Sequence, residues 1–206
     1  MAPYNLVLSL FFFLLLPLCS PSSPQINTLP SDHQGNNLVR ASCIHARYPA
    51  VCLRTLSAYR GPTSTPYEVA RAALKVSLAR AHSLTLLLSS KSLSHRPTSK
   101  KESAAFRDCA EMIASTVDEL SGALDELKRL GKVGAGREAF GWAMSNAETW
   151  VSAALTDEDT CLEGFGEGGV AKGDVIRKKV KNVAKATSNA LYMINKLDKS
   201  RGKVRV

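Results

Sequence analysis

Four stretches of the chain repeat apolar residues at alternating spacings of four and three, the pattern of a helix that buries one face. The clearest of them spans residues 106–127, where the stripe is unbroken. Its apolar positions are Phe106, Ala110, Ile113, Val117, Leu120, Leu124 and Leu127. Cys109 lies at the edge of this stripe, one turn before Ile113. We therefore expect this helix to be the centre of a helical bundle, with a cysteine where it meets its neighbours.

Local signals predict where the other helices begin. Thr65, Pro66 and Glu68 have the spacing of a capping box with proline at the first helical position. Ser99 and Glu102 form a second box, and the glycines of LGKVGAG and GFGEGG separate the helices that follow. The apolar stripes of these three helices are Val69, Ala73, Val76, Leu84 and Leu87, then Phe140, Met144, Ala147, Val151 and Ala154, and finally Ile176, Val180, Val183, Thr187, Ala190, Ile194 and Leu197.

Four long helices joined by three short connections predict an all-α fold, an up-down-up-down four-helix bundle. The composition agrees, because no stretch alternates β-branched and polar residues as strands do. The 206 residues, of which 45% are apolar, suffice for one sizeable core. Arg80 interrupts the stripe of the first bundle helix, and we expect its stem to lie along apolar surface and its charged head to reach solvent.

The first residues have the pattern of a secretory leader. Residues 6–16 are the run LVLSLFFFLLL, too short to span a membrane comfortably, and small and turn-forming residues follow it. We interpret this segment as a signal peptide rather than an anchor, cleaved between Cys19 and Ser23. The expected organisation is a signal peptide (1–22), a flexible segment (23–35), a domain over 36–200 made of a helical hairpin (36–60) and the bundle (65–200), and a basic tail (201–206).

Cleavage there removes Cys19 and leaves four cysteines in the mature chain, Cys43, Cys52, Cys109 and Cys161. An even number in a secreted chain predicts an oxidising compartment and two disulfides, for which three pairings exist. Sequence distance favours Cys43 with Cys52, because the Tyr-Pro pair between them favours a turn between two short helices. A bond between Cys109 and Cys161 would tie the central helix to the third long one and contribute about 4 kcal/mol in the loop-entropy model.

The sequence lacks the motifs of catalysis and metal binding. It has no G-x-S-x-G, no His and Cys at catalytic spacing, and GFGEGGVAKG lacks the G-K-[ST] ending of a phosphate-binding loop. The histidines (His33, His45, His82 and His95) have no ligand spacing, so we expect no metal and no cofactor. A binder of small apolar ligands would need a cavity, against which the Ala-rich stripes argue. We therefore expect a protein that is not an enzyme.

Three separated segments contain the four mature cysteines: SCIHARYPAVCLRTLSAY, FRDCAEMIASTVDEL and ETWVSAALTDEDTCLEGF. They resemble, in that order, the N-terminal hairpin, the third-cysteine helix and the fourth-cysteine segment of the plant invertase and pectin methylesterase inhibitor family. The resemblance covers roughly residues 36–200. The chain departs from many relatives at Ile113, where they carry a tyrosine.

This resemblance implies pairing of Cys43 with Cys52 and of Cys109 with Cys161, and a bundle preceded by a short disulfide-linked helical hairpin. It also implies a secreted protein of the apoplast and cell wall that inhibits an enzyme stoichiometrically. The target would be either a pectin methylesterase, whose pectin-binding cleft the bundle would cover, or an acid invertase of the wall or vacuole. The SAALTDEDTC run and the absence of a Pro-Lys-Phe triplet favour the pectin methylesterase.

The resemblance also implies contact residues for the target among the polar positions near the third and fourth cysteines. These are Glu111, Thr160 and Glu163, with Glu148 as a further candidate. The alternative interpretation is structural: Thr160 would cap a helix end, and the glutamates would be ordinary solvated surface.

Positive charge is concentrated at the end of the chain. Residues 171–206 carry eleven Lys or Arg and two Asp, which accounts for the whole net charge of +9. Lys178, Lys181 and Lys185 share the outer side of the last helix, with Lys179 on its flank. One interpretation is attraction to the anionic pectin of the wall, and with it comes an alternative function, a non-inhibitory helical-bundle module bound to that polysaccharide. The other interpretation is a solvated helix face whose basic end suits the helix dipole. Nucleic acid is a poor partner for a secreted chain.

Overall fold

The computed structural model of the protein describes residues 32–94, 99–132, 136–165 and 171–202. These ranges contain six helices and no strand. The helices are α2 (Asp32–Cys43), α3 (Pro49–Ser57), α4 (Pro66–Ser94), α5 (Lys100–Lys132), α6 (Arg137–Gly164) and α7 (Ala171–Gly202). The first of them begins at Asp32, ahead of the boundary expected at residue 36. The leader expected over 1–22 lies outside the described residues.

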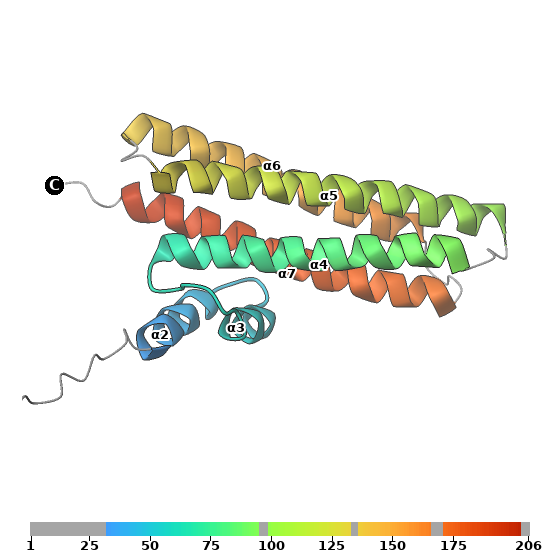
Figure 1. The fold of residues 1–206 in the computed structure, drawn as a ribbon, viewed down its shortest axis with the longest axis horizontal. Coiled ribbons are helices and arrows are strands. Elements are labelled where there is room, and N and C mark those ends of the chain that lie inside the picture. Colours follow the sequence, from blue (N-terminus) through green and yellow to red (C-terminus); the bar gives the residue numbers. More distant parts are fainter. Residues whose placement is uncertain (1–31, 95–98, 133–135, 166–170, 203–206) are drawn as a thin grey trace, which may run out of the picture. The chain divides into compact units, whose positions relative to one another are not determined.

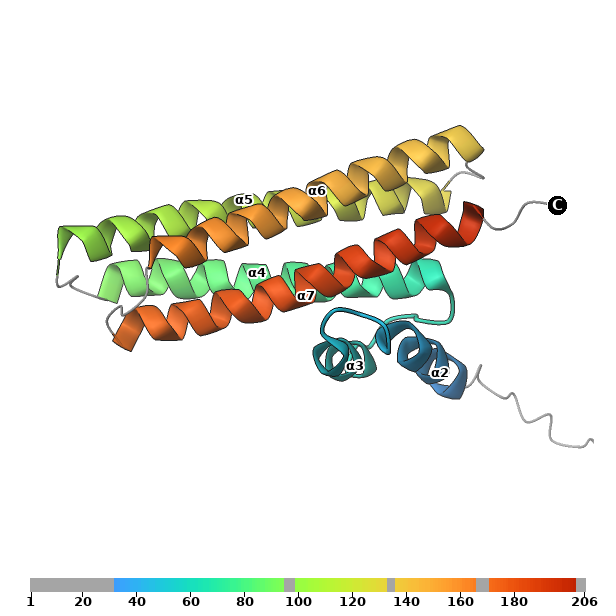
Figure 2. The same cartoon turned by 180° about the vertical axis from the view of Figure 1, so that it is seen from behind.

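The four long helices form the predicted bundle. α4 packs against α5, α5 against α6, α6 against α7, and α7 closes the ring on α4 (Figure 1). Each of these helices runs antiparallel to the next, as the view from behind also shows (Figure 2). The hairpin of α2 and α3 contacts α4, and α3 also contacts α7. The expected up-down-up-down bundle with a preceding helical hairpin is confirmed.

The long helices begin where the chain supplies capping groups. At the start of α4, the backbone N–H of Glu68 donates to Thr65 Oγ1 at 3.2 Å, and the N–H of Thr65 donates to Glu68 Oε2 at 3.0 Å. Pro66 occupies the first helical position, as predicted. At the start of α5, the N–H of Glu102 donates to Ser99 Oγ at 3.1 Å. Both predicted helix starts are therefore confirmed.

The core is built from the predicted apolar stripes. Every stripe position of α6 and α7 is buried. In α5 the buried line is shifted slightly: Cys109 and Thr116 are buried, whereas Ala110 and Val117 are only half-buried. The shift places the cysteine inside the core instead of at the edge of the stripe. In the same way, Ser77 replaces a stripe residue of α4 as a buried position.

A buried carboxyl group lies inside the bundle. Glu158 of α6 has a relative exposure of 0%. The hydroxyl of Thr187 on α7 donates to Glu158 Oε1 at 2.7 Å, and Ser77 Oγ on α4 lies 2.6 Å from Thr187 Oγ1. A hydroxyl group can donate one hydrogen bond and accept others, so Thr187 can take part in both contacts. One chain of hydrogen bonds therefore connects three of the four bundle helices.

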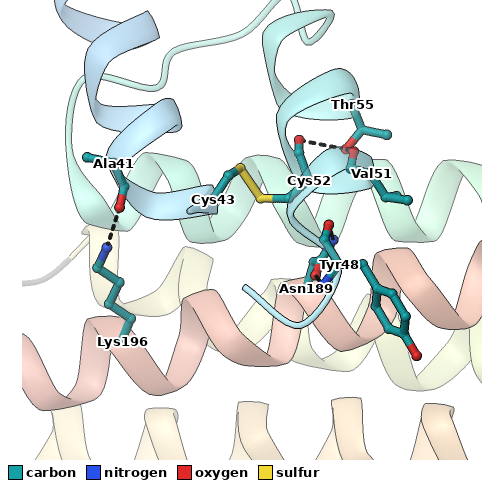
Figure 3. Close-up of a disulfide and its surroundings, with 8 residues drawn as sticks. All are labelled: Ala41, Cys43, Tyr48, Val51, Cys52, Thr55, Asn189 and Lys196. Atoms are coloured by element: carbon teal, nitrogen blue, oxygen red, sulfur yellow. Dashed lines mark hydrogen bonds between the residues drawn. A yellow bond between two sulfur atoms is a disulfide. The ribbon is translucent and has the colours of Figure 1, made fainter. Parts of the chain in front are cut away.

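The hairpin is held to the bundle by polar contacts to its backbone (Figure 3). A disulfide joins Cys43 at the end of α2 to Cys52 in α3, as expected. The buried Asn189 of α7 accepts a bond from the N–H of Tyr48 and donates to its carbonyl oxygen, both at 3.0 Å. Lys196 Nζ lies 3.4 Å from the carbonyl oxygen of Ala41, near the end of α2. α7 therefore contacts the turn and the end of one hairpin helix.

Candidate partner-binding surface

A second disulfide ties the central helix to its neighbour. Cys109 of α5 is bonded to Cys161 of α6, and their Cα atoms are 4.3 Å apart. One turn before Cys109, the ring of Phe106 packs edge-on against Phe165, with centroids 5.2 Å apart. A covalent bond and an aromatic contact therefore fix α5 against α6 at the end where α5 begins and α6 ends.

Three of the four predicted contact residues lie close to this disulfide along the two helices. Glu111 follows Cys109 by two positions on α5, Thr160 directly precedes Cys161, and Glu163 follows Cys161 by two positions on α6. All three side chains are exposed. The disulfide thus places the three at one level of the bundle, on two helices that it joins covalently.

The structure changes the interpretation of two candidates, Thr160 and Glu148. Thr160 does not cap α6, because the helix continues beyond it and its hydroxyl donates to the carbonyl oxygen of Thr156 at 2.8 Å. Glu148 lies apart from the disulfide and is half-buried. Burial raises the pKa of Glu148, nearby Asp198 of α7 raises it further, and Lys199 opposes the shift. Glu148 therefore lies near the C-terminal end of α7, on a different surface from the other three candidates.

Two exposed tryptophans on α6 are absent from the predicted site residues. Trp142 is 66% exposed and Trp150 is 43% exposed. The ring of Trp150 lies over Gly122 of α5, where an added Cβ would approach it to 3.3 Å. Both tryptophans lie outside the buried stripe of α6, and single exposed aromatic side chains of this kind are common on protein surfaces. The part of each ring that stays exposed adds apolar area to the surface of α6.

Acidic groups where α5 and α6 pack have raised pKa values. Burial raises the pKa of Glu119 to about 7, and the charges of Asp157 and Asp118 contribute to the shift. Burial also raises the pKa of Asp157. Because these carboxyl groups gain protons below neutral pH, this part of the α5–α6 pair is less negative in acidic surroundings than at neutral pH.

The four lysines predicted to bind a polyanion divide between two grooves beside α7. Lys178 and Lys181 are exposed and line an open groove of about 400 Å³. Lys185 lines the same groove but is half-buried, with Nζ 5.7 Å from the centroid of the Tyr48 ring, a cation–π contact with the hairpin. Lys179 lines the other groove, with residues of α3 and α4. Asn182 lines both grooves, so the two lie next to each other along α7.

The described ranges contain neither a metal-binding cluster nor a membrane-spanning helix. Nowhere in them do three or more His, Cys, Asp or Glu side chains come together in a way that could hold a metal ion. None of the helices in the described part of the chain has the length and apolar character needed to cross a membrane.

The bundle, the hairpin and the two disulfides define a known class of plant proteins. A family model described as plant invertase/pectin methylesterase inhibitor matches residues 37–193, which include all four bonded cysteines. The chain belongs to this family, as its cysteine motifs indicated.

Individual relatives extend over nearly the whole chain. It is 47% identical over 184 residues to pectinesterase inhibitor 3 of Arabidopsis thaliana, covering 86% of this chain and 87% of that protein. It is 39% identical over 194 residues to pectinesterase inhibitor 9 of the same plant, covering 92% and 94%. A crystal structure of a mutant form of a pectin methylesterase inhibitor from Arabidopsis aligns with a TM-score of 0.59 at 21% identity, over 74% of this chain and 92% of that one. This last likeness shows a shared fold.

Proposed function

We propose that the protein is a secreted inhibitor of pectin methylesterase that binds its target one to one and limits the de-esterification of cell-wall pectin. The observation that carries the proposal is the 47% identity to a pectinesterase inhibitor over 86% of the chain. A second relative at 39% identity has the same kind of name. The expected leader over 1–22 provides the route to the apoplast, and the protein itself needs no catalytic group.

Inhibition in this proposal works by obstruction. The exposed face of α5 and α6 around the Cys109–Cys161 bond lies across the pectin-binding cleft of the esterase and excludes the polymer. A surface that a disulfide and a packed bundle already hold in place loses little conformational entropy on binding. An interface of standard size, with roughly 1,200–2,000 Å² buried in total, would occupy much of the outer surface of two helices.

We expect the three exposed residues near the disulfide to contribute to this contact. A triple variant, Glu111→Gln with Thr160→Ala and Glu163→Gln, should raise the inhibition constant for a plant pectin methylesterase by about tenfold or more, since each lost polar contact costs about 1 kcal/mol. The measurement is residual esterase activity against inhibitor concentration, for the oxidised wild type and the variant side by side.

The matched control changes the same helix at its other end. Glu138 and Ser145 are exposed on α6, far along the helix from Cys161. The pair Glu138→Gln and Ser145→Ala should inhibit as the wild type does. A triple variant that melts normally and inhibits as strongly as this control would remove Glu111, Thr160 and Glu163 from the contact.

A second candidate target is acid invertase, because the description of the matching family includes invertase inhibitors. A further proposed role concerns α7. Lys178 and Lys181 are exposed, and with Lys185 they make the surface beside α7 positive. Their charge would attract anionic pectin through a long-range force that salt screens.

A further inference from the structure

A groove between the hairpin and the bundle combines positive charge with an apolar floor. Its volume is about 540 Å³, within the usual range of ligand sites. The cations are Arg54 of α3, Arg80 of α4 and Lys179 of α7. Its apolar lining includes Leu87, which is half-buried, and Val175, which is 51% exposed. Three separate helices therefore each contribute one cation to the same groove.

The geometry keeps these cations together without an acidic partner. Arg80 is half-buried, and its Nη1 donates to the carbonyl oxygen of Asn182 on α7 at 3.0 Å in an exposed position. That bond leaves its other N–H groups for a ligand. Burial lowers the pKa of Arg80, and the nearby positive charge of Arg54 lowers it further. In the described ranges, the ion pairs involve none of Arg54, Arg80 or Lys179.

We propose that this groove binds a sugar chain that carries carboxylates, an oligouronide. The guanidinium forks of Arg54 and Arg80 match carboxylate geometry, and Lys179 adds a third charge. The C–H faces of the sugar rings would lie on Leu87 and Val175. A purely apolar ligand would leave the three cations unused, and an isolated small anion would leave the apolar floor uncovered.

This inference rests on the proposed function for its choice of polymer. Pectin methylesterase converts methyl esters into carboxylates, so the ligand has the chemistry of the product of the proposed target. Binding in the groove would hold the inhibitor where de-esterification has already taken place. The groove is formed by α3, α4 and α7, whereas the proposed esterase contact lies on α5 and α6, so the two bindings are compatible.

The test is a calorimetric titration of the oxidised protein, without esterase, with a short de-esterified oligogalacturonide. The same oligomer in methyl-esterified form and inorganic phosphate serve as comparison ligands. We expect binding of the de-esterified chain, with an affinity at least about tenfold above that of either comparison ligand, because charged bidentate contacts and the apolar floor are both required. Equal binding of phosphate would show a general anion site and overturn the inference.

Two charge-matched triple variants separate the groove from net charge. Arg54→Gln, Arg80→Gln and Lys179→Gln should reduce affinity at least about tenfold, whereas Lys178→Gln, Lys181→Gln and Lys185→Gln should reduce it only about twofold to threefold through screened attraction. Both sets remove three positive charges. Equal losses in the two triples, or none in the first, would contradict the assignment.

A second pair of variants changes exposed residues only, so a loss of binding is not expected to be caused by unfolding of the protein. Val175→Asp places a negative charge in the groove and should weaken binding about tenfold. Leu86→Asp changes a residue of α4 that is 72% exposed and does not line the groove, so it should bind as the wild type does. Equal binding by these two variants would also overturn the inference. Esterase inhibition is measured separately, so a failure there rejects the proposed function, whereas a failure of oligouronide binding rejects only the groove.

Discussion

Replacing Glu158 by Gln should remove most of the pH dependence of stability. Burial raises the pKa of Glu158 from its ordinary value of 4.5 to about 8, and the charges of Asp159, Glu119 and Asp157 add to this, against the hydrogen bond from Thr187. The folded protein therefore keeps this carboxyl group protonated at a pH where the unfolded chain has lost the proton.

The sign follows from that difference in proton binding. Below pH 4.5 both states are protonated and the group costs nothing. Between pH 4.5 and 8 only the folded state holds the proton, so the free energy of unfolding falls as pH rises, and above pH 8 it is constant again. A shift of this size corresponds to a loss on the order of 5 kcal/mol across the window. The protein should be most stable in acidic surroundings.

The measurement is urea unfolding followed by circular dichroism at pH 4.5 and pH 8. The wild type should be markedly less stable at pH 8, and Glu158→Gln should lose much less, with a remainder from Glu119, whose pKa is raised to about 7. Glu158→Met is a second test, because the Thr187 hydroxyl can donate to the Val183 carbonyl oxygen, 3.2 Å away, instead. Equal losses in the wild type and both variants would show that Glu158 is not the group responsible.

The second large effect concerns the disulfide between α5 and α6. Replacing both Cys109 and Cys161 by Ala should lower the free energy of unfolding by about 4 kcal/mol, because the bond closes a loop of 52 residues that the unfolded chain would otherwise explore. Replacing Cys43 and Cys52 by Ala opens a loop of only 9 residues and should cost about 2.5 kcal/mol.

The two double variants are each other's controls, since each removes one disulfide and two sulfur atoms. Both are measured by urea unfolding at pH 4.5, where the Glu158 contribution is absent. Loss of the Cys109–Cys161 bond should lower the free energy of unfolding more than loss of the Cys43–Cys52 bond. A hairpin variant that is equally or more unstable would mean that loop length does not govern the contribution of these bonds.

The helices could be predicted from the sequence because their signals are local. The Thr65–Glu68 box and the α7 stripe each depend on residues within a few positions, and both are present as expected. The disulfide pairing followed from the family resemblance carried by the cysteine motifs. The burial of Glu158 was not predicted from the sequence, for a specific reason. Its position continues the apolar stripe of α6 between Ala154 and Cys161, but a glutamate at such a position is expected to be solvated unless a buried hydrogen-bond partner is known. That partner, Thr187, is 29 residues away.

The groove between the hairpin and the bundle could not be predicted either, because its residues are far apart in the sequence. Arg54, Arg80 and Lys179 come from three helices, and nothing in the spacing of one helix reveals that the others bring like charges beside it. Lys185 is a similar case, because the helix spacing placed it on the outer side of α7 but could not show that the hairpin brings the Tyr48 ring beside it. Tertiary contacts, which no periodicity encodes, decided both outcomes.

Inhibition of a pectin methylesterase by this chain can be measured directly. The mature, oxidised protein is titrated against a plant pectin methylesterase and, in parallel, against a plant acid invertase. We expect esterase activity to be lost at near-equimolar inhibitor while invertase activity is unchanged. Loss of invertase activity with the esterase unaffected, or no effect on either enzyme, would show that the protein is not an inhibitor of pectin methylesterase.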